Sequence, residues 1–371
     1  MERVNIVIIG AGIVGLALAA RLSEIEKGIY ILERKPRYGL ETSSHNGGVI
    51  HSGIHYPPGS LKAILCVRGN SMIYDICERY RIPCKKLGKL TVAVNEEEVN
   101  ELERLLQWGL ANGVNGLKML EGEYIKKMEP NVNAERALYS PSTGIVEPDA
   151  LMDYFYAKAS KNGALLVTNT EVKCLSKDDD GYEVFGVSFG EKFMIKANTV
   201  INCAGLCADK IAGTAGLDVE KLGYKLHYCK GEYFRLIGKP PVRMLVYPVP
   251  KGGVLGIHLN LDIAGNARLG PNAHYVDTVS YEVTSSEREF IENVEKFLPC
   301  IREHQLTPDF AGIRPKLHGP HEGFRDFVIR HEADRELFGL INLIGIESPG
   351  LTAAPAIAEF VTEIYEQEIE K

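Results

Sequence analysis

Three histidines lie close together in a segment that favours neither a helix nor a strand. Residues 43–60 read SSHNGGVIHSGIHYPPGS and place His45, His51 and His55 among glycines, serines and two prolines. Histidine can take up or release a proton near neutral pH, because its ordinary pKa is about 6.5. The segment could therefore bind a metal ion, line a reaction site or form an ordinary polar loop, and the rest of the chain must distinguish these.

A metal site in this segment has little support. His51 and His55 would lie on one side of a helix, but the glycines and prolines around them oppose helix formation. Residues 43–60 also contain no cysteine and no acidic residue. We therefore expect no metal ion here.

Length, charge and cysteine content restrict the class of protein. The 371 residues are enough for two domains or one large α/β unit. The net charge is −7 and no stretch is rich in lysine and arginine, so we expect no nucleic-acid partner. The eight cysteines include no C-x-x-C pair, which argues against a zinc ribbon or an iron–sulfur cluster and suits reduced thiols in the cytoplasm.

The first 34 residues match a dinucleotide-binding βαβ unit. A β-branched run, Val4–Ile9, precedes GAGIVG, an Ala/Leu-rich helix reaches about Leu22, and a second strand, Ile29–Leu32, ends at an acidic residue. The first glycine makes the tight turn, the second lets a pyrophosphate approach the backbone, and the third lets the helix pack on the strand. The helix N-terminus faces the phosphates and the acid accepts the ribose hydroxyls. The predicted nucleotide contacts are Gly10, Gly12, Ile13, Val14, Gly15, Glu33 and Arg34.

This unit also explains the apolar run at residues 4–22, which could otherwise be taken for a signal peptide. No other run approaches the ~20 apolar residues of a membrane span, so we expect no transmembrane segment. Glu33 would repel a 2′-phosphate, which leaves FAD or NAD as the nucleotide.

Three later segments favour FAD over NAD. Residues 199–205 (TVINCAG) read as a strand that ends in small residues, where a cofactor can pass close to the backbone. Residues 166–175 read as an alternating strand. Residues 340–344 read as a strand, and GIESPGLT then leads into a helix whose N-terminus could stabilise the negative charge of a reduced flavin.

With these elements in place, the chain resembles the D-amino-acid-oxidase-like (DAO) superfamily of FAD-dependent oxidoreductases, and within it L-2-hydroxyglutarate dehydrogenases and oxidases. The resemblance runs nearly end to end. It is carried by HNGGVIHSGIHY (45–56), SLKAILCVRG (60–69), GKLTVAV (88–94), STGIVEP (142–148), INCAGLCAD (201–209), YPVP (247–250), LGIHL (255–259), LGPNA (269–273) and AGIRPKL (311–317). The chain departs from this family at His55, where an aromatic residue is usual, and in GIESPGLT, which looks closer to glycerol-3-phosphate dehydrogenase-like relatives.

The resemblance implies an α/β protein with a Rossmann-like FAD-binding domain and a discontinuous α+β substrate domain built on an antiparallel sheet. We expect the FAD-binding domain to comprise residues 1–82, 140–222 and 310–371, and the substrate domain residues 83–139 and 223–309. Short alternating segments between about residues 223 and 309 agree with an antiparallel sheet.

The resemblance also implies where the cofactor and the substrate bind. The histidine segment would wrap the flavin, and the cofactor contacts beyond the βαβ unit would be Ser43, Ser44, His45, Gly47, Gly48, Val172, Ala204, Gly205, Gly345, Ser348, Gly350, Leu351 and Thr352. The catalytic candidates are His51, His258, Tyr247 and Arg314. An ordinary structural role remains the alternative for His51 and for the strand residue His258.

The reaction implied is the oxidation of L-2-hydroxyglutarate to 2-oxoglutarate. Arg314, helped by Tyr247, would bind the C1 carboxylate in a bidentate manner. His51 or His258 would take the C2 hydroxyl proton while the C2 hydride moves to flavin N5, so activity should fall as the pH decreases through the pKa of that histidine. Lys62 and Lys230 are weaker candidates for binding the second carboxylate.

Several alternatives stay open. The enzyme could act on glycerol 3-phosphate or on an N-methyl amino acid with the same flavin and arginine, or it could be a flavin-holding electron-transfer subunit. A plain NAD dehydrogenase is the remaining reading. We expect a small anionic substrate, an electron acceptor that is oxygen, a quinone or a flavoprotein, and a cytoplasmic location in which peripheral contact with a membrane stays open.

Overall fold

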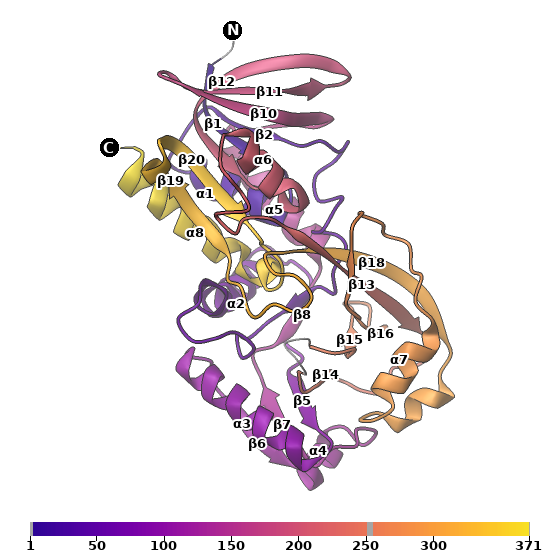
Figure 1. Ribbon diagram of the computed structural model, residues 1–371. Helices are drawn as coiled ribbons and strands as arrows, with labels where there is room; N and C mark the ends of the chain where they lie inside the picture. The colour runs from indigo at the N-terminus through magenta and orange to yellow at the C-terminus, as the bar shows by residue number, and fades with distance from the viewer. Residues whose placement is uncertain (1–2, 251–254, 371) are drawn as a thin grey trace. The chain divides into compact units, whose positions relative to one another are not determined.

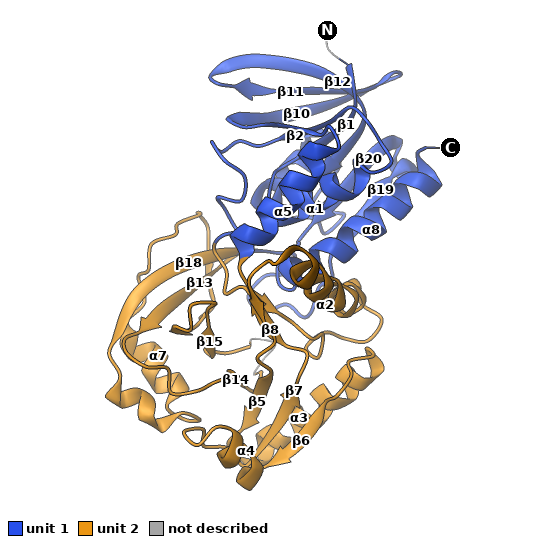
Figure 2. Cartoon of the chain, turned by 180° about the vertical axis from the view of Figure 1, so that it is seen from behind, with its two compact units in different colours: residues 1–44, 148–227, 314–371 blue, residues 45–147, 228–313 orange. Residues whose placement is uncertain are grey.

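The computed structural model describes residues 3–250 and 255–370, which fold into two compact units (Figure 2). The first unit comprises residues 1–44, 148–227 and 314–371, and the second residues 45–147 and 228–313. The expected division placed residues 45–82 and 140–147 with the nucleotide domain. In the structure they belong to the second unit, because β3 (Val49–Ile50) pairs with β8 (Gly144–Val146) and β8 pairs with β4 (Cys84–Lys85).

The first unit is built on an eight-stranded sheet with a parallel centre (Figure 1). Strands β20, β12, β1, β2 and β9 are parallel neighbours in that order, and β19 adds an antiparallel edge. Strands β10 and β11 form a hairpin that extends the sheet from the first half of β12. The bounds are β1 (Arg3–Ile9), β2 (Ile29–Leu32), β9 (Leu165–Val167), β10 (Thr170–Asp178), β11 (Gly181–Ser188), β12 (Glu191–Asn202), β19 (Val328–Glu332) and β20 (Leu337–Ile344).

Helices cover this sheet and explain why the second half of its central strand, Ile6–Ile9 of β1, is apolar. Helix α1 (Ile13–Leu22) packs against α5 (Pro148–Lys161) and α8 (Gly350–Glu368), while α6 (Ala208–Thr214) contacts β10, β12 and β20. A strand covered on both faces must be hydrophobic on both. The predicted order of strand, glycine turn, helix and second strand is confirmed.

One predicted strand differs in the structure. Residues 166–175 form parts of two strands, β9 and β10, rather than one. The chain turns between them at Asn169, whose φ of 50° lies in the left-handed region that asparagine tolerates.

The second unit is built on a nine-stranded, largely antiparallel sheet. The order is β17, β13, β16, β15, β14, β5, β7 and β6, and β18 also pairs with β13. Among the described residues, β5 and β14 pair in parallel, whereas β13–β16, β13–β17, β14–β15, β15–β16, β5–β7 and β6–β7 pair antiparallel. The antiparallel platform predicted from the sequence is therefore confirmed. The bounds are β5 (Lys89–Ala93), β6 (Lys118–Glu121), β7 (Arg136–Ser140), β13 (His227–Leu236), β14 (Leu245–Pro248), β15 (Leu259–Leu261), β16 (Ala267–Leu269), β17 (His274–Val276) and β18 (Leu306–Lys316).

Four α-helices complete the second unit within the residues that the structure describes. They are α2 (Leu61–Tyr80), α3 (Glu96–Ala111), α4 (Gly122–Met128) and α7 (Glu287–Val294). Helix α3 packs on β5 and β7, and α4 packs on β6 and β7. Within residues 3–250 and 255–370, no helix is long and apolar enough to cross a membrane.

Three adjacent strands of this sheet carry different residues on their two faces. Side chains alternate along a strand, so Leu90 of β5, Val246 of β14 and Leu259 of β15 share one face and one apolar core. The opposite face carries Lys89, Thr91, Tyr247 and Asn260, which are 0%, 0%, 1% and 2% exposed. We call this second face the buried polar face, and it includes His258, which directly precedes β15.

Candidate active site

The glycine turn of the first unit has the backbone that a nucleotide requires. Gly10 has a φ of +97°, and a Cβ there would lie 2.6 Å from the carbonyl oxygen of Cys203. A Cβ at Gly15 would lie 2.1 Å from the carbonyl oxygen of Gly10. Both positions therefore exclude any side chain, and the turn stays narrow enough for helix α1 to begin beside the strand ends.

Polar groups around the start of α1 fit the phosphates and ribose of FAD. Ser43 Oγ accepts a hydrogen bond from Ile13 N at 2.9 Å. Glu33 accepts hydrogen bonds from Ala11 N at 2.9 Å and from Lys35 N at 2.8 Å, while burial raises the pKa of its carboxyl group. The N–H groups of Val14 and Gly15, in the first turn, have no carbonyl partner within the helix and can face a pyrophosphate.

Other cofactor candidates of the first unit lie at strand ends and at the start of α8. Gly205 has a φ of +53° and follows β12, and Ala204 N donates to Asn202 Oδ1 at 3.2 Å. Gly345 has a φ of +74° and follows β20, and Thr352 is buried in the first turn of α8. These are the places where the nucleotide-binding fold brings strand ends and a helix N-terminus toward a ligand.

Six more of the predicted site residues also lie in this unit. Arg34 pairs with Glu41 at 2.5 Å, and its Nη1 lies 3.2 Å from Cys207 Sγ. Val172 is buried in β10, and Arg314 projects from the end of β18. Ser348, Gly350 and Leu351 lie at the start of α8.

Substitution of Gly12 tests the nucleotide turn. Gly12→Val should lower the affinity for FAD by about 10- to 100-fold, because the side chain meets Ser43 Oγ (already 2.9 Å from a Cβ at this position) and fills the approach to the helix N-terminus. The ratio of flavin to protein absorbance after purification measures this loss. Gly213→Ala is the control, since a Cβ there meets only Val219 at 3.7 Å. A Gly12→Val protein that retains full FAD content would contradict the assignment.

In the second unit, three residues of the buried polar face form a stacked and hydrogen-bonded group. The rings of Tyr247 and His258 are stacked with 3.7 Å between their centres. The Tyr247 hydroxyl donates to Asn260 Oδ1 at 2.8 Å. His258 Nδ1 lies 2.8 Å from the Gly256 carbonyl oxygen, and a carbonyl can only accept, so Nδ1 carries the proton. In the neutral ring Nε2 is then a proton acceptor.

A second group on this face pairs a lysine with a histidine of the loop. Lys89 Nζ lies 2.8 Å from His55 Nε2 and 4.7 Å from the centre of the Tyr247 ring. Burial lowers the pKa of Lys89 to about 7, against a small opposing effect of Cys66. Burial and then the charge of Lys89 lower the pKa of His51 to about 3, and the same causes lower the pKa of His55 well below its ordinary value. Both histidines are therefore neutral at neutral pH.

The histidine loop itself is held by backbone contacts within the second unit. Asn70 donates to the His51 carbonyl at 2.9 Å, and Asn112 donates to the carbonyls of Gly53 and Tyr56 at 3.0 and 2.9 Å. Further along the loop, the rings of His45 and Tyr281 are stacked with 4.1 Å between their centres, and a Cβ at Gly47 would lie 3.4 Å from Asn260 Nδ2. Gly48 has a φ of +64°. The loop is ordered against the buried polar face, and among the described residues no group of histidine, cysteine and acidic side chains could hold a metal ion.

The structure therefore divides the predicted site residues between the two units. His45, Gly47, Gly48, His51, Tyr247 and His258 lie in the second unit, whereas Ser43, Ser44, Arg314 and the βαβ and α8 residues lie in the first. Sequence reasoning missed Lys89 and Asn260. Alternation in GKLTVAV was the available signal, since Lys89 and Thr91 share a face opposite Leu90 and Val92.

One of the two lysines considered for binding the second carboxylate of the substrate already pairs with an acidic residue of the protein. Lys230 forms a buried ion pair with Glu232 at 2.6 Å, and this carboxylate also accepts hydrogen bonds from Thr284 N and Ser285 N. Its charge is already balanced within the protein, which suits a structural role. Lys62 is buried in the first turn of α2.

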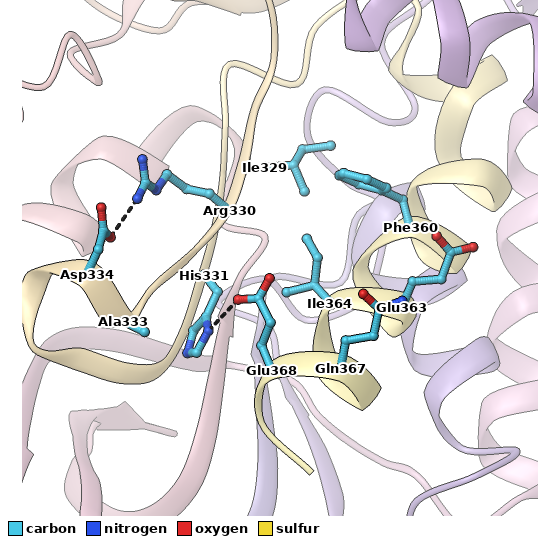
Figure 3. Close-up of a pocket in the computed structure, with 10 residues that line it drawn as sticks. All are labelled: Ile329, Arg330, His331, Ala333, Asp334, Phe360, Glu363, Ile364, Gln367 and Glu368. Atoms are coloured by element: carbon cyan, nitrogen blue, oxygen red, sulfur yellow. Dashed lines mark hydrogen bonds and ion pairs between the residues drawn. The ribbon is translucent and has the colours of Figure 1, made fainter. Parts of the chain in front are cut away.

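A surface hollow of about 590 Å³ in the first unit lies away from these residues. It lies between β19 and the C-terminal half of α8, where His331 pairs with Glu368 at 2.9 Å and Arg330 with Asp334 at 2.6 Å (Figure 3). The α8 residues that line it begin at Phe360, ~15 Å along the helix axis from Gly350. The hollow is therefore separate from the nucleotide-binding end of α8.

Comparisons with known proteins agree with this arrangement. The family model described as FAD dependent oxidoreductase (DAO) matches residues 5–364. The chain is 38% identical to the mitochondrial L-2-hydroxyglutarate dehydrogenase of Arabidopsis thaliana, over 98% of this chain and 84% of that protein. It is 30% identical to the glycerol 3-phosphate dehydrogenase of Caloramator mitchellensis, over 97% and 73%. The solved structure of L-alpha-glycerophosphate oxidase from Mycoplasma pneumoniae, with FAD bound, has a TM-score of 0.86 and 28% identity over 99% of this chain and 95% of that chain.

Proposed function

Because the chain belongs to the family of FAD dependent oxidoreductases, we propose that it oxidises L-2-hydroxyglutarate, a small 2-hydroxy acid, to 2-oxoglutarate. The chain is an oxidoreductase whose cofactor is FAD. The observation that carries the choice of reaction is the buried polar face, which combines a proton acceptor, His258 Nε2, with the buried amino group of Lys89. The 38% identity to an L-2-hydroxyglutarate dehydrogenase supports this choice of acid.

The residues of the first unit would hold the cofactor. Gly10, Gly12 and Gly15 would admit the pyrophosphate to the start of α1, Glu33 would accept the ribose hydroxyls, and the start of α8 would face the flavin. When bound, FAD supplies the acceptor for the hydride that leaves C2 of the substrate.

The protein's own groups would bind the acid and remove one proton. Arg314 offers two parallel N–H groups to the C1 carboxylate, and Tyr247 assists it. His258 Nε2 takes the C2 hydroxyl proton, and the C–H electron pair leaves C2, so the substrate loses two electrons and two hydrogens and becomes the 2-oxo acid. His51 is the second candidate base, and its low pKa makes it the weaker proton acceptor.

Glycerol 3-phosphate is the second candidate substrate. The relatives of 30% and 28% identity are named for glycerol 3-phosphate and glycerophosphate, and Arg314 could bind a phosphate in the same bidentate manner. A flavin-holding electron-transfer subunit is the candidate of a different class.

Anaerobic mixing with candidate substrates separates these functions. The purified protein is mixed with L-2-hydroxyglutarate, its D isomer, glycerol 3-phosphate or sarcosine, and the visible absorbance of the flavin is followed. We expect rapid bleaching by L-2-hydroxyglutarate and none by the D isomer. Bleaching by glycerol 3-phosphate instead would transfer the proposal to that substrate, and flavin that none of the four reduces would refute a small-alcohol oxidoreductase of this kind.

A further inference from the structure

Lys89 is a buried cation with an unusual set of partners. Its side chain is 0% exposed, and its ammonium group contacts His55 Nε2 and the face of the Tyr247 ring. Within the part of the chain that the structure describes, no acidic side chain forms an ion pair with it. A neutral imidazole therefore holds the ammonium group in place without cancelling its charge.

The contrast with Lys230 shows what a structural lysine looks like in the same unit. Lys230 is similarly buried, but Glu232 balances its charge at 2.6 Å. Burying an ammonium group without an anion costs free energy, so a fold that keeps one usually uses the charge. Burial lowers the pKa of Lys89 to about 7, and an anion that binds nearby would favour its charged form.

Polar atoms around Lys89 are also left incomplete. His55 Nδ1 and Thr91 Oγ1 are buried and have no hydrogen-bond partner among the described residues. If the ammonium group donates to His55 Nε2, then Nδ1 of the same ring carries a proton and is a donor. Lys89, His55 and Thr91 thus present donors, and the chemistry missing from this part of the face is an acceptor that carries negative charge.

We propose that Lys89, held by His55, supplies the positive charge that selects a dicarboxylic acid, by attracting the carboxylate distal to the reacting carbon. The inference rests on the proposed function, in which Arg314 binds the carboxylate next to that carbon. Lys89 is fully buried beside His55, so its charge acts on a bound acid over a distance and not by direct contact. In a site of low dielectric such a charge remains strong over several ångströms. Lys89 is in this sense a specificity-determining residue rather than a catalytic one.

The test uses Lys89→Gln, which removes the charge and can still hydrogen-bond to His55, and Lys89→Arg, which restores a charge. Both FAD-loaded variants are titrated with glutarate and with butyrate, two acids that carry no hydroxyl to oxidise, and binding is measured from the perturbation of the flavin spectrum. We expect Lys89→Gln to weaken glutarate binding by about 10- to 100-fold, to change butyrate binding by less than about 3-fold, and Lys89→Arg to recover most of the loss. Lys118→Gln, on the exposed edge strand β6, is the matched control.

Steady-state kinetics with L-2-hydroxyglutarate give a second readout. For Lys89→Gln, KM should rise by a similar factor while kcat stays within about 3-fold, since the charge binds the substrate rather than taking part in the chemistry. Equal weakening of glutarate and butyrate, or no weakening of either, would overturn the inference. If the wild-type protein binds glutarate but no 2-hydroxy acid reduces its flavin, the proposed function fails. The comparison of glutarate with butyrate binding in the Lys89 variants still tests the role of the charge.

A structural role for Lys89 predicts a different pattern. A lysine that only supports the fold would, when replaced, lower the melting temperature and the FAD content and affect both acids alike. Removal of an uncompensated buried charge should instead leave the melting temperature unchanged or raised. A large fall in melting temperature together with FAD loss in Lys89→Gln, rescued by Lys89→Arg without any change in acid selectivity, would overturn the inference as well.

Discussion

Replacement of Arg314 by methionine should lower kcat/KM for L-2-hydroxyglutarate by about 10²- to 10³-fold while FAD content stays at the wild-type level. Under the proposed function, this guanidinium group binds the carboxylate adjacent to C2 through two parallel hydrogen bonds. Removing it leaves the substrate carboxylate without its partner and leaves C2 poorly oriented for hydride transfer. Stopped-flow reduction of the flavin at several substrate concentrations measures both the affinity and the rate.

Arg314→Lys sharpens this prediction, because lysine keeps the charge and loses the planar, two-pronged geometry. We expect it to recover about 10-fold of the loss and no more. Arg325→Met is the control: Arg325 is an exposed arginine of the same unit that donates to the Gly223 carbonyl at 3.1 Å. Wild-type kinetics in Arg314→Met would rule out the carboxylate clamp, and a selective loss with glycerol 3-phosphate would favour the alternative substrate.

The nucleotide-binding half could be predicted from the sequence because its signals are local. Val4–Ile9, the glycines and Glu33 lie within one short segment, and each residue type answers to a steric or electrostatic need of the turn. The structure adds that Glu33 is tied to Ala11 N and Lys35 N, so the same carboxylate also supports the turn. The sequence does not predict either hydrogen bond, because both donors are backbone N–H groups, which almost every residue carries.

The domain membership of residues 45–82 was less predictable, because the contacts that decide it are not local in the sequence. The histidine loop follows the nucleotide-binding segment in sequence, which favoured placing both in one domain. Its fold membership is decided by distant partners, the pairing of β3 with β8 and the bonds from Asn70 to the carbonyls of His51 and Ser142. Contacts of this kind join residues that are far apart in the sequence. They depend on the path of the chain between those residues, which a local pattern of residue types does not specify.

Lys89 shows the limit for the candidate site. A lysine at the first position of a short strand is normally read as exposed, because lysine is seldom fully buried. Only the register of β5 beside β14 places it on the same face as Tyr247, and only the fold of the loop brings His55 to its ammonium group. Alternation in GKLTVAV indicates that Lys89 and Thr91 share a face, but it does not indicate that this face lies against the histidine loop.

His258→Gln should lower the rate of flavin reduction by about 10²- to 10⁴-fold with little change in substrate affinity. The Gly256 carbonyl fixes the ring so that Nε2 can accept the hydroxyl proton, and glutamine cannot take up a proton there. We expect His51→Gln to reduce the rate by no more than about 10-fold, because a base with a pKa near 3 accepts a proton weakly. His321→Gln, an exposed histidine of the first unit, is the control.

The pH profile of flavin reduction assigns the base independently. The pKa of His51 is lowered to about 3, so this ring stays neutral from about pH 5 upward and its protonation cannot reduce the rate between pH 5 and 7. This differs from the sequence expectation that assumed an ordinary histidine. A rate that falls with acidification in that range in the wild type but not in His51→Gln would therefore contradict the assignment to His258.

Lys89 contributes to the profile with the opposite sign. Its pKa is lowered to about 7, so it loses its proton as the pH rises through that value, and kcat/KM for a dicarboxylic acid should then decline while the limiting rate does not. The groups that act on this site are His51 and His55 of the loop, Cys66 of α2, Arg104 of α3, Tyr247 of β14 and His258 before β15. Lys89→Gln should abolish the alkaline decline and leave the effect of His258 on the limiting rate intact. The two substitutions thus separate the charge that attracts the substrate from the base that takes its proton.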